Sequence, residues 1–332
     1  MGAVDFDNLF SSFTGLKVAV IGDVMLDTYW WGRVDRISPE APVPVVAITK
    51  KDYRLGGAAN VALNIKALNA DVTMFSVIGD DDDAKLLTKR FDEEGIVTSQ
   101  LLKSSRRITT NKSRIISRNQ QMMRLDAEIT TDLDEDDEAR LIDAVKIYIE
   151  SERPAVIIFE DYNKGVLTER VIKTVINLAR QHNIITTVDP KRKNFFSYQG
   201  VSIFKPNLKE VRDALNLLTD DIDASSLQQI HHRLAEQLSH KTSFVTLSEK
   251  GVFYHDDEMS GIVPSHVRNI SDVSGAGDTV IAVASLVYAV TKDVLLMAEM
   301  ANIAGGLVCE EVGTVAINKE RLLEECKMLL GA

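Results

Sequence analysis

The chain has 332 residues, of which 45% are apolar and 26% charged, so it has the composition of a globular protein with a sizeable core. Acidic residues outnumber basic ones by 49 to 38, and the surface as a whole is therefore expected to repel nucleic acid and anionic membranes. No apolar run approaches the ~20 residues of a membrane helix, and no secretory signal pattern follows Met1. Two cysteines, Cys309 and Cys326, cannot build a disulfide framework. These features predict a protein of the reducing cytoplasm.

Short apolar strands alternate with helical patterns along the chain, which predicts an α/β fold with a mostly parallel sheet covered on both faces. The central strands are predicted at 17–22, 72–78, 155–159, 184–188, 201–204 and 243–247. Helices are predicted at 60–68, after the acidic run 80–83, at 134–150, 168–182 and 225–238, and through most of the last third of the chain. Because no linker, repeat or low-complexity tract interrupts the pattern, residues 1–332 are expected to form a single domain.

Two stretches, residues 29–55 and 109–128, break this alternation. The first contains Pro39, Pro42 and Pro44 among alternating valines, which suits extended edge strands. The second also alternates between polar and apolar residues. Both are predicted to form a small β-sheet that is inserted into the domain as a lid. Since extended strands present unpaired edges, the lid is also expected to pair with a second copy and form a homodimer.

The sharpest local signal is the sequence Asp-Val-Ser-Gly-Ala-Gly-Asp at 272–278, followed by an apolar helical pattern at 279–290. Small residues at 274–277 allow backbone N–H groups to point into a concavity, and the helix adds its positive end, so the segment can hold phosphate oxygens. Asp278 could take the proton of an incoming hydroxyl. Alternatively, Asp278 only caps the helix and the glycines form a tight turn.

A second glycine-containing signal is Gly56-Gly57-Ala-Ala-Asn60, again at a predicted helix start. Glycines let the backbone approach a ligand closely, and the Asn60 amide can hydrogen-bond a sugar hydroxyl, although a plain turn explains the glycines equally well. Asp27 lies just past the first strand, where open α/β sheets bind ligands, and it could also be a simple turn or capping residue.

Two further groups of residues could bind charged ligands. Asn207 and Glu210 would lie on one face of a helix and could hold Mg²⁺ through water, or they could form an ordinary capping box. The stretch from 106 to 124 could gather cations for a phosphorylated substrate, or it could be a solvated strand surface. Its basic residues are Arg106, Arg107, Lys112, Arg114, Arg118 and Arg124.

Several rival chemistries lack their motifs. The first strand is followed by Asp-Val-Met rather than by a dinucleotide-binding glycine pattern, and the chain has no Walker-type phosphate loop. The six histidines show no metal-ligand spacing. The pair His231 and His232 is expected on a solvated helix face.

Taken together and in this order, these motifs resemble the ribokinase-like (PfkB) family of sugar kinases over nearly the whole chain. The resemblance implies a ribokinase-like three-layer fold with a lid and ATP-dependent phosphoryl transfer to a sugar hydroxyl. It implies Asp278 as catalytic base, an anion hole at Gly275, Ala276 and Gly277, and sugar contacts from Asp27, Gly56, Gly57 and Asn60. It also implies Asn207 and Glu210 at Mg²⁺ and the ATP phosphates, Ser248, Gly251 and Asn302 at the nucleotide, and a monovalent cation such as K⁺ beside Asp272. Ser248 stands where many members have glycine.

Within the family, four segments look most similar to D-glycero-β-D-manno-heptose-7-phosphate kinases, namely those at 36–45, 119–126, 161–165 and 189–191. This similarity implies transfer to the anomeric O1, which gives the 1,7-bisphosphate of the ADP-heptose pathway for lipopolysaccharide. Many such enzymes carry a fused nucleotidyltransferase domain; since this chain ends at Ala332, the adenylyl-transfer step is expected to belong to a separate protein. The implied contacts to the sugar phosphate are Arg124, Asp161, Lys164, Asp189 and Lys191.

Two alternatives remain at this point. The same scaffold could phosphorylate another sugar, a sugar phosphate or a nucleoside, which an assay across a substrate panel would separate. From a different class, the chain could be a sugar-binding regulator without catalysis, although such a protein would have no need of the base Asp278.

Overall fold

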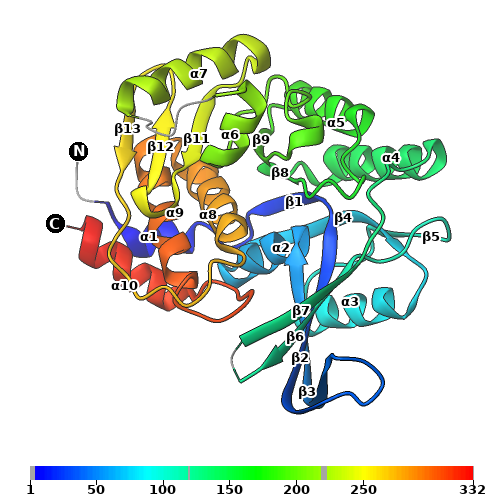
Figure 1. Cartoon of the computed structure of the whole chain (residues 1–332). Coiled ribbons are helices and arrows are strands. Elements are labelled where there is room, and N and C mark those ends of the chain that lie inside the picture. The colour runs from blue at the N-terminus through cyan, green and yellow to red at the C-terminus, as the bar shows by residue number, and fades with distance from the viewer. Residues whose placement is uncertain (1–3, 119, 218–222, 332) are drawn as a thin grey trace.

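A nine-stranded, mostly parallel sheet forms the centre of the computed structural model, which describes residues 4–118, 120–217 and 223–331 (Figure 1). Asn119, the first residue of one segment that carries the heptose-kinase resemblance, lies outside the described residues. The strand order is β13-β12-β11-β10-β9-β8-β1-β4-β5, and only the β11–β12 and β12–β13 pairs are antiparallel. The strands are β1 Lys17–Gly22, β4 Asp71–Gly79, β5 Leu101–Ser104, β8 Val156–Glu160, β9 Ile185–Asp189, β10 Ile203–Phe204, β11 Thr242–Thr246, β12 Val252–His255 and β13 Ser260–Val263.

Helices cover both faces of this sheet, because successive strand residues point their apolar side chains to opposite sides. Val18 and Val20 of β1 pack on one side, and Ala19 and Ile21 on the other. The first side is covered by α1 Phe6–Ser11, α2 Ala58–Ala67, α3 Asp82–Glu93, α8 Ala276–Thr291, α9 Val294–Val308 and α10 Lys319–Leu330. The second side is covered by α4 Glu135–Glu152, α5 Glu169–Gln181, α6 Leu208–Leu215 and α7 Ala224–Leu238. The predicted three-layer fold is confirmed.

A second, four-stranded sheet projects from the body of the molecule (Figure 1). Its order is β3-β2-β6-β7, and its strands are β2 Val24–Ile37, β3 Pro44–Gly57, β6 Asn111–Ser117 and β7 Gln120–Ala127. The predicted lid sheet is therefore present, although β2 begins earlier than expected because Asp23 alone separates it from β1. That the whole chain folds as a single domain stays a prediction.

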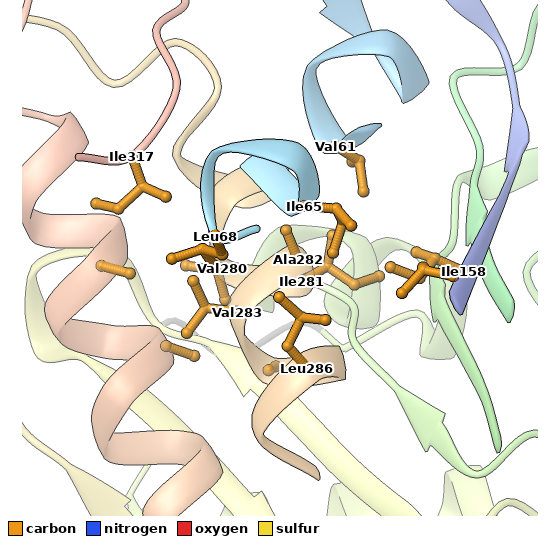
Figure 2. Packing of buried hydrophobic residues seen from close by; sticks show 14 of the residues in the cluster. Val61, Ile65, Leu68, Ile158, Val280, Ile281, Ala282, Val283, Leu286 and Ile317 are labelled. Carbon is orange, nitrogen blue, oxygen red and sulfur yellow. The ribbon is translucent and has the colours of Figure 1, made fainter. Parts of the chain in front are cut away.

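Helices α2 and α8 pack against each other on one face of the nine-stranded sheet (Figure 2). Val61 and Ile65 of α2 face Ile281 and Ala282 of α8, and Ile158 of β8 closes this cluster from the sheet. All five side chains are fully buried or nearly so. Since such close-packed interiors resist displacement, the first turn of α8 is held at a fixed position over the sheet.

The sequence patterns did not predict three short strands, β5, β12 and β13. The expectation that both His231 and His232 are solvated is wrong for His231. His232 is exposed on α7 as expected, but His231 is buried and stacks on His255 of β12, with 3.7 Å between ring centroids. The reason is that α7 lies on the sheet and turns this position toward β12. Within the described ranges, no helix is both long and apolar enough to span a membrane.

Candidate functional site

Charged side chains gather where neighbouring parallel strands end. Asp23 follows β1, Asp161 follows β8, Asp189 ends β9 and Lys205 follows β10, and all four are buried. Carboxyl ends of parallel strands meet at one edge of a sheet, which is where open α/β sheets bind their ligands. The sequence analysis missed Asp23 and Lys205, although their positions directly after predicted strands were a usable signal.

Asp278 lies beside this edge in the first turn of α8 and is 3% exposed. Its Oδ2 accepts a hydrogen bond from Asn60 Nδ2 at 2.8 Å, and its Oδ1 accepts one from the Tyr162 hydroxyl at 2.7 Å. Burial raises the pKa of Asp278 to about 6, even though both hydrogen bonds favour the carboxylate and lower it. A carboxyl group with this pKa can accept a proton near neutral pH.

Asp278 does not cap α8, so the alternative offered for it is not the arrangement found. The helix begins at Ala276, and its N-cap is Gly275, with φ at +79°. A Cβ on Gly275 would lie 2.7 Å from Asn60 Nδ2, so glycine is needed here both for its backbone conformation and for the close approach of the side chain that holds Asp278.

The three residues expected to form an anion hole lie together at the start of α8. The Ala276 N–H already donates to the carbonyl of Val273 at 3.3 Å, which leaves Gly275 and Gly277 as the stronger candidates. A Cβ on Gly277 would lie 3.5 Å from Asp189 Oδ2, so this backbone passes directly over the charged edge of the sheet. The anion hole stays a prediction.

Lys191 joins several predicted site residues into one ion-pair network. Its Nζ lies 2.8 Å from Asp189 Oδ1 and 2.7 Å from Glu210 Oε1, and Lys205 Nζ lies 2.7 Å from Asp189 Oδ2. Burial alone would raise the pKa of Asp189, but the two ammonium groups outweigh it and hold the pKa below its usual value. The network therefore keeps Asp189 ionised and fixes Lys191 beside the site.

Asn207 and Glu210 form the capping box of α6. Asn207 Oδ1 accepts from the Glu210 N–H and Glu210 Oε2 accepts from the Asn207 N–H, both at 2.8 Å. The structural alternative for this motif is thus present, and it leaves the oxygen atoms in a fixed place beside Lys191. Among the described residues, no cluster of three or more His, Cys, Asp or Glu could hold a metal directly. Mg²⁺ bound through water at Asn207 and Glu210, an arrangement that needs no direct protein cage, stays a prediction.

Asp27 and the glycines of β3 lie at the base of the lid. Asp27 Oδ1 is ion-paired with Arg114 at 2.5 Å, and its Oδ2 accepts from Thr314 Oγ1 at 3.1 Å. A Cβ on Gly56 would lie 2.4 Å from Asp27 Oδ2, and Gly57 has φ at +59°. Both glycines are therefore required by this close approach and by the turn into α2.

The loop after β8 is held by Asp23. Its carboxylate accepts from the backbone N–H groups of Tyr162, Lys164 and Val166 at 2.8 to 3.0 Å, which places the Tyr162 hydroxyl on Asp278. Asp161 lies at the start of the same loop, where burial and the nearby Asp23 raise its pKa to about 7. Tyr162 was not predicted as a site residue, because nothing in the sequence indicates where its hydroxyl lies.

All three cations expected at a substrate phosphate are already paired with carboxylates, Lys191 in the network described above. Arg124 lies on β7 with its side chain 51% exposed and forms two hydrogen bonds with Asp126. Lys164 is 2.7 Å from Glu128. Lys191 Nζ lies 5.4 Å from the centroid of the Tyr162 ring, and the hydroxyl of that ring is hydrogen-bonded to Asp278. Arg124, in contrast, lies on the exposed part of the lid.

The residues expected at the nucleotide lie around β11 to β13. Ser248 has φ at +55°, the left-handed region that favours glycine, which agrees with the glycine that many similar proteins have there. Gly251 has φ at +96°, and a Cβ on it would lie 2.0 Å from the carbonyl oxygen of Val263. Asn302 Nδ2 donates to the carbonyl of Pro264 at 2.8 Å. These contacts fix the loop geometry; contact with a nucleotide stays a prediction.

Asp272 holds the turn before α8. One of its oxygens accepts from the backbone N–H and hydroxyl of Ser274, and the other from the Gly313 N–H at 3.0 Å. Burial would raise the pKa of Asp272, but these hydrogen bonds lower it, so the carboxylate stays ionised.

The sequence is similar to known proteins over nearly its whole length. The sequence pattern described as "pfkB family carbohydrate kinase" matches residues 16–321. The chain is 38% identical to the Bifunctional protein HldE of Syntrophotalea carbinolica over 98% of its own length and 66% of that protein. It is also 38% identical to the Bifunctional protein HldE of Aliarcobacter butzleri, over 93% of its length and 64% of that protein. The chain thus spans slightly less than two thirds of the length of these relatives.

Solved structures share the fold. Phosphofructokinase-2 from Escherichia coli, in complex with potassium, aligns with a TM-score of 0.78 at 18% identity, over 96% of this chain and 100% of the other. A ribokinase from Arabidopsis thaliana, complexed with ribose and ATP, aligns with a TM-score of 0.72 at 15% identity, over 94% of this chain and 99% of the other.

Proposed function

Because the chain belongs to the pfkB family of carbohydrate kinases, we propose that it transfers the γ-phosphoryl group of ATP to the anomeric O1 of D-glycero-β-D-manno-heptose 7-phosphate. The observation that carries this proposal is the position of Asp278. Its carboxyl group lies at the N-terminus of α8, beside the glycines of the preceding turn, and has a pKa of about 6. A base and a set of backbone donors thus lie together at the ligand-binding edge of the sheet.

In the proposed mechanism, Asp278 accepts the proton of the sugar hydroxyl as that oxygen attacks phosphorus. The N–H groups of Gly275 and Gly277, together with the positive end of α8, stabilise negative charge on the transferred group. Mg²⁺, when bound through water at Asn207 and Glu210, would neutralise charge on the ATP phosphates. Lys191, fixed by Asp189 and Glu210, contributes a positive charge beside the site.

The choice of heptose 7-phosphate rests on similarity and on charge. The relatives that match over nearly the whole chain carry the name Bifunctional protein HldE, and the four segments named above resemble heptose-7-phosphate kinases. Four cations, Lys112, Arg114, Lys164 and Lys191, lie near the base of the lid and Tyr162, which suits an anionic sugar. Another sugar phosphate would fit the same charges and is the second candidate.

Three further features belong to the proposal. We place the protein in the cytoplasm, where its buried free thiols Cys309 and Cys326 would stay reduced. A monovalent cation such as K⁺ is proposed beside Asp272; equal turnover in potassium and in a bulky organic-cation buffer would contradict it.

A homodimer through the lid would cover the exposed apolar side chains of the edge strand β7, such as Met123 and Leu125. A monomer in sedimentation at working concentration would contradict the dimer.

The deciding experiment is product identification. The protein is incubated with ATP, Mg²⁺ and heptose 7-phosphate, and the product is analysed by mass spectrometry and ³¹P NMR. An anomeric phosphate on a 1,7-bisphosphate is expected. A product from a different sugar phosphate, with none from the heptose, would replace the substrate, and binding without turnover of any sugar would favour the non-catalytic regulator.

A further inference from the structure

Lys112, a cation of the lid sheet, lies near the Tyr162 ring and forms no ion pair with the residues that the structure describes. Lys112 belongs to β6, and in the parallel pairing of β2 with β6 it stands directly opposite Asp27. Paired residues of neighbouring strands project to the same face of a sheet, so Lys112 lies on the face that carries the Asp27 carboxylate. The side chain is partly buried there.

The surrounding cations each form an ion pair with a carboxylate, whereas Lys112 forms none within the part of the chain that the structure describes. Arg114 is paired with Asp27, Lys164 with Glu128, and Lys191 with Asp189 and Glu210. Among the described residues, Lys112 forms no ion pair or side-chain hydrogen bond, and the carboxylates of Asp27, Glu128 and Asp126 attract its charge from beyond ion-pair distance. The Tyr162 ring and these carboxylates replace only part of the water contacts that this partly buried ammonium group has lost, since burial still outweighs them and lowers its pKa.

The position of Lys112 relative to the base is set by Tyr162. Lys112 Nζ lies 5.3 Å from the centroid of the Tyr162 ring, and Lys191 Nζ lies 5.4 Å from the same centroid. The hydroxyl of this ring is hydrogen-bonded to Asp278. Two ammonium groups thus border one aromatic ring whose far end contacts the base. A sugar whose reacting hydroxyl lies at Asp278 would extend along Tyr162 toward Lys112.

We propose that Lys112 binds the phosphate group that the sugar substrate already carries, and that it thereby sets the preference for a phosphorylated over an unphosphorylated sugar. This proposal rests on the proposed function, since it requires a substrate with a remote phosphate. Burial lowers the pKa of Lys112, and a bound phosphate would restore the lost electrostatic stabilisation of its charge. Binding energy gained at a remote phosphate can position the reacting hydroxyl.

The test compares two substrates in two variants. Initial rates are measured with heptose 7-phosphate and with the unphosphorylated heptose, each for the native protein, for Lys112→Gln and for Lys112→Arg. Lys112→Gln is expected to lower kcat/KM for the phosphorylated sugar roughly ten- to a hundredfold, the usual effect of losing a charged hydrogen bond, and mainly through KM. The value for the unphosphorylated sugar should change less than about twofold. Lys112→Arg keeps the charge and should recover most of the loss.

A matched control is Lys51→Gln, because Lys51 belongs to the same lid sheet and also lies over an aromatic ring, 4.3 Å from Trp30. This variant should keep the native preference for the phosphorylated sugar. If Lys112→Gln keeps that preference as well, or loses both substrates equally while its thermal unfolding is native-like, the role of Lys112 is wrong and the proposed function stands. If the native protein itself shows no preference for the phosphorylated sugar, the proposed substrate is wrong, and the role of Lys112 is overturned with it.

Discussion

The Tyr162 hydroxyl donates a hydrogen bond to Asp278 Oδ1 at 2.7 Å, while the backbone N–H of the same tyrosine donates to Asp23 Oδ2 at 2.8 Å. One residue thus connects the loop after β8 to the first turn of α8. Because the hydroxyl favours the ionised carboxylate, it offsets part of the effect of burial on the pKa of Asp278.

The first prediction concerns this contact. Tyr162→Phe removes the donor, so the pKa of Asp278 should rise above about 6. A base works only when it is deprotonated, and the acid side of the pH profile of kcat should therefore move to higher pH by roughly one unit, the equivalent of a hydrogen bond of about 1.4 kcal/mol. An acid limb that stays in place would show that Asp278 does not titrate in the rate-determining step. Tyr53→Phe, a change of a tyrosine in β3 of the lid, serves as control.

The second prediction is the loss of the base itself. Asp278→Asn should lower kcat by roughly 10²–10⁴, the usual contribution of a general base. The fold should persist, because an amide can still accept one of the hydrogen bonds now made by Asn60 and Tyr162. Turnover and the circular dichroism melting curve are measured on the same preparation. Near-native turnover would remove Asp278 from the mechanism.

The fold and the location of the site were predictable because they depend on local patterns. Strand and helix periods indicated the parallel sheet, and Gly275 and Asp278 stand within a motif that can be identified in the sequence alone. Tyr162 and Lys205 were not predictable as site residues, because their roles come from contacts between segments 116 and 16 residues apart. The spacing of Asn207 and Glu210 did indicate the capping box that is present, but not the ion pair of Glu210 with Lys191, which joins two separate segments.

The third prediction compares two glycines with similar backbone conformations. Gly15 has φ at +76° with open space around its Cα, whereas Gly275 has φ at +79° and faces Asn60. Alanine at either position should cost roughly 1–2 kcal/mol of stability from left-handed strain. Only Gly275→Ala should also displace Asn60 and lower kcat, by at least about tenfold, since Asn60 holds Asp278. The values of kcat and the unfolding free energies from urea titration are measured for both variants. Equal kcat values would contradict the role given to the close approach of Gly275 and Asn60.

The fourth prediction concerns Glu160, the last residue of β8. Its side chain is fully buried, and both carboxyl oxygens lack a hydrogen-bond partner among the residues that the structure describes. Burial raises its pKa well above the usual value, and the nearby Asp189 and Asp278 raise it further. A group whose pKa is higher in the folded state lowers stability as pH rises above its unfolded pKa of about 4.3.

Glu160→Gln should therefore increase the free energy of unfolding at pH 7 by at least about 1 kcal/mol, since a tenfold change in proton affinity corresponds to about 1.4 kcal/mol. At pH 4 the two proteins should differ much less. The exposed Glu150→Gln on α4 is the control and should show neither change. If Glu160→Gln instead lowers the free energy of unfolding at pH 7 and does so less at pH 4, the carboxylate is stabilised in the fold and the prediction is wrong.

The last prediction follows from the buried histidines behind β11. His231 Nδ1 and His240 Nε2 both contact Ser243 Oγ, at 2.9 and 2.6 Å, and His255 stacks on His231. Burial lowers the pKa of His231 and of His240 to about 4 in each case, and the neighbouring rings add to this effect. In the unfolded chain these groups take up protons near pH 6.5. At these two imidazoles the unfolded state therefore binds more protons between pH 6.5 and 4, and their contribution to stability falls as pH decreases through that window.

For the pair, the expected loss between pH 7 and pH 5 is roughly 2 kcal/mol, after allowance for partial solvent screening. Urea unfolding at the two pH values measures it as the difference between the native protein and a variant without the two imidazoles, because the raised pKa of Glu160 changes stability in the opposite direction in both proteins. The double variant His231→Gln, His240→Gln removes both titrating groups, so its stability should change less over this range, whereas His182→Gln on the C-cap of α5 should behave like the native protein. If the native protein and the double variant change equally in stability between pH 7 and pH 5, the two imidazoles are not held neutral in the fold, and the prediction is wrong.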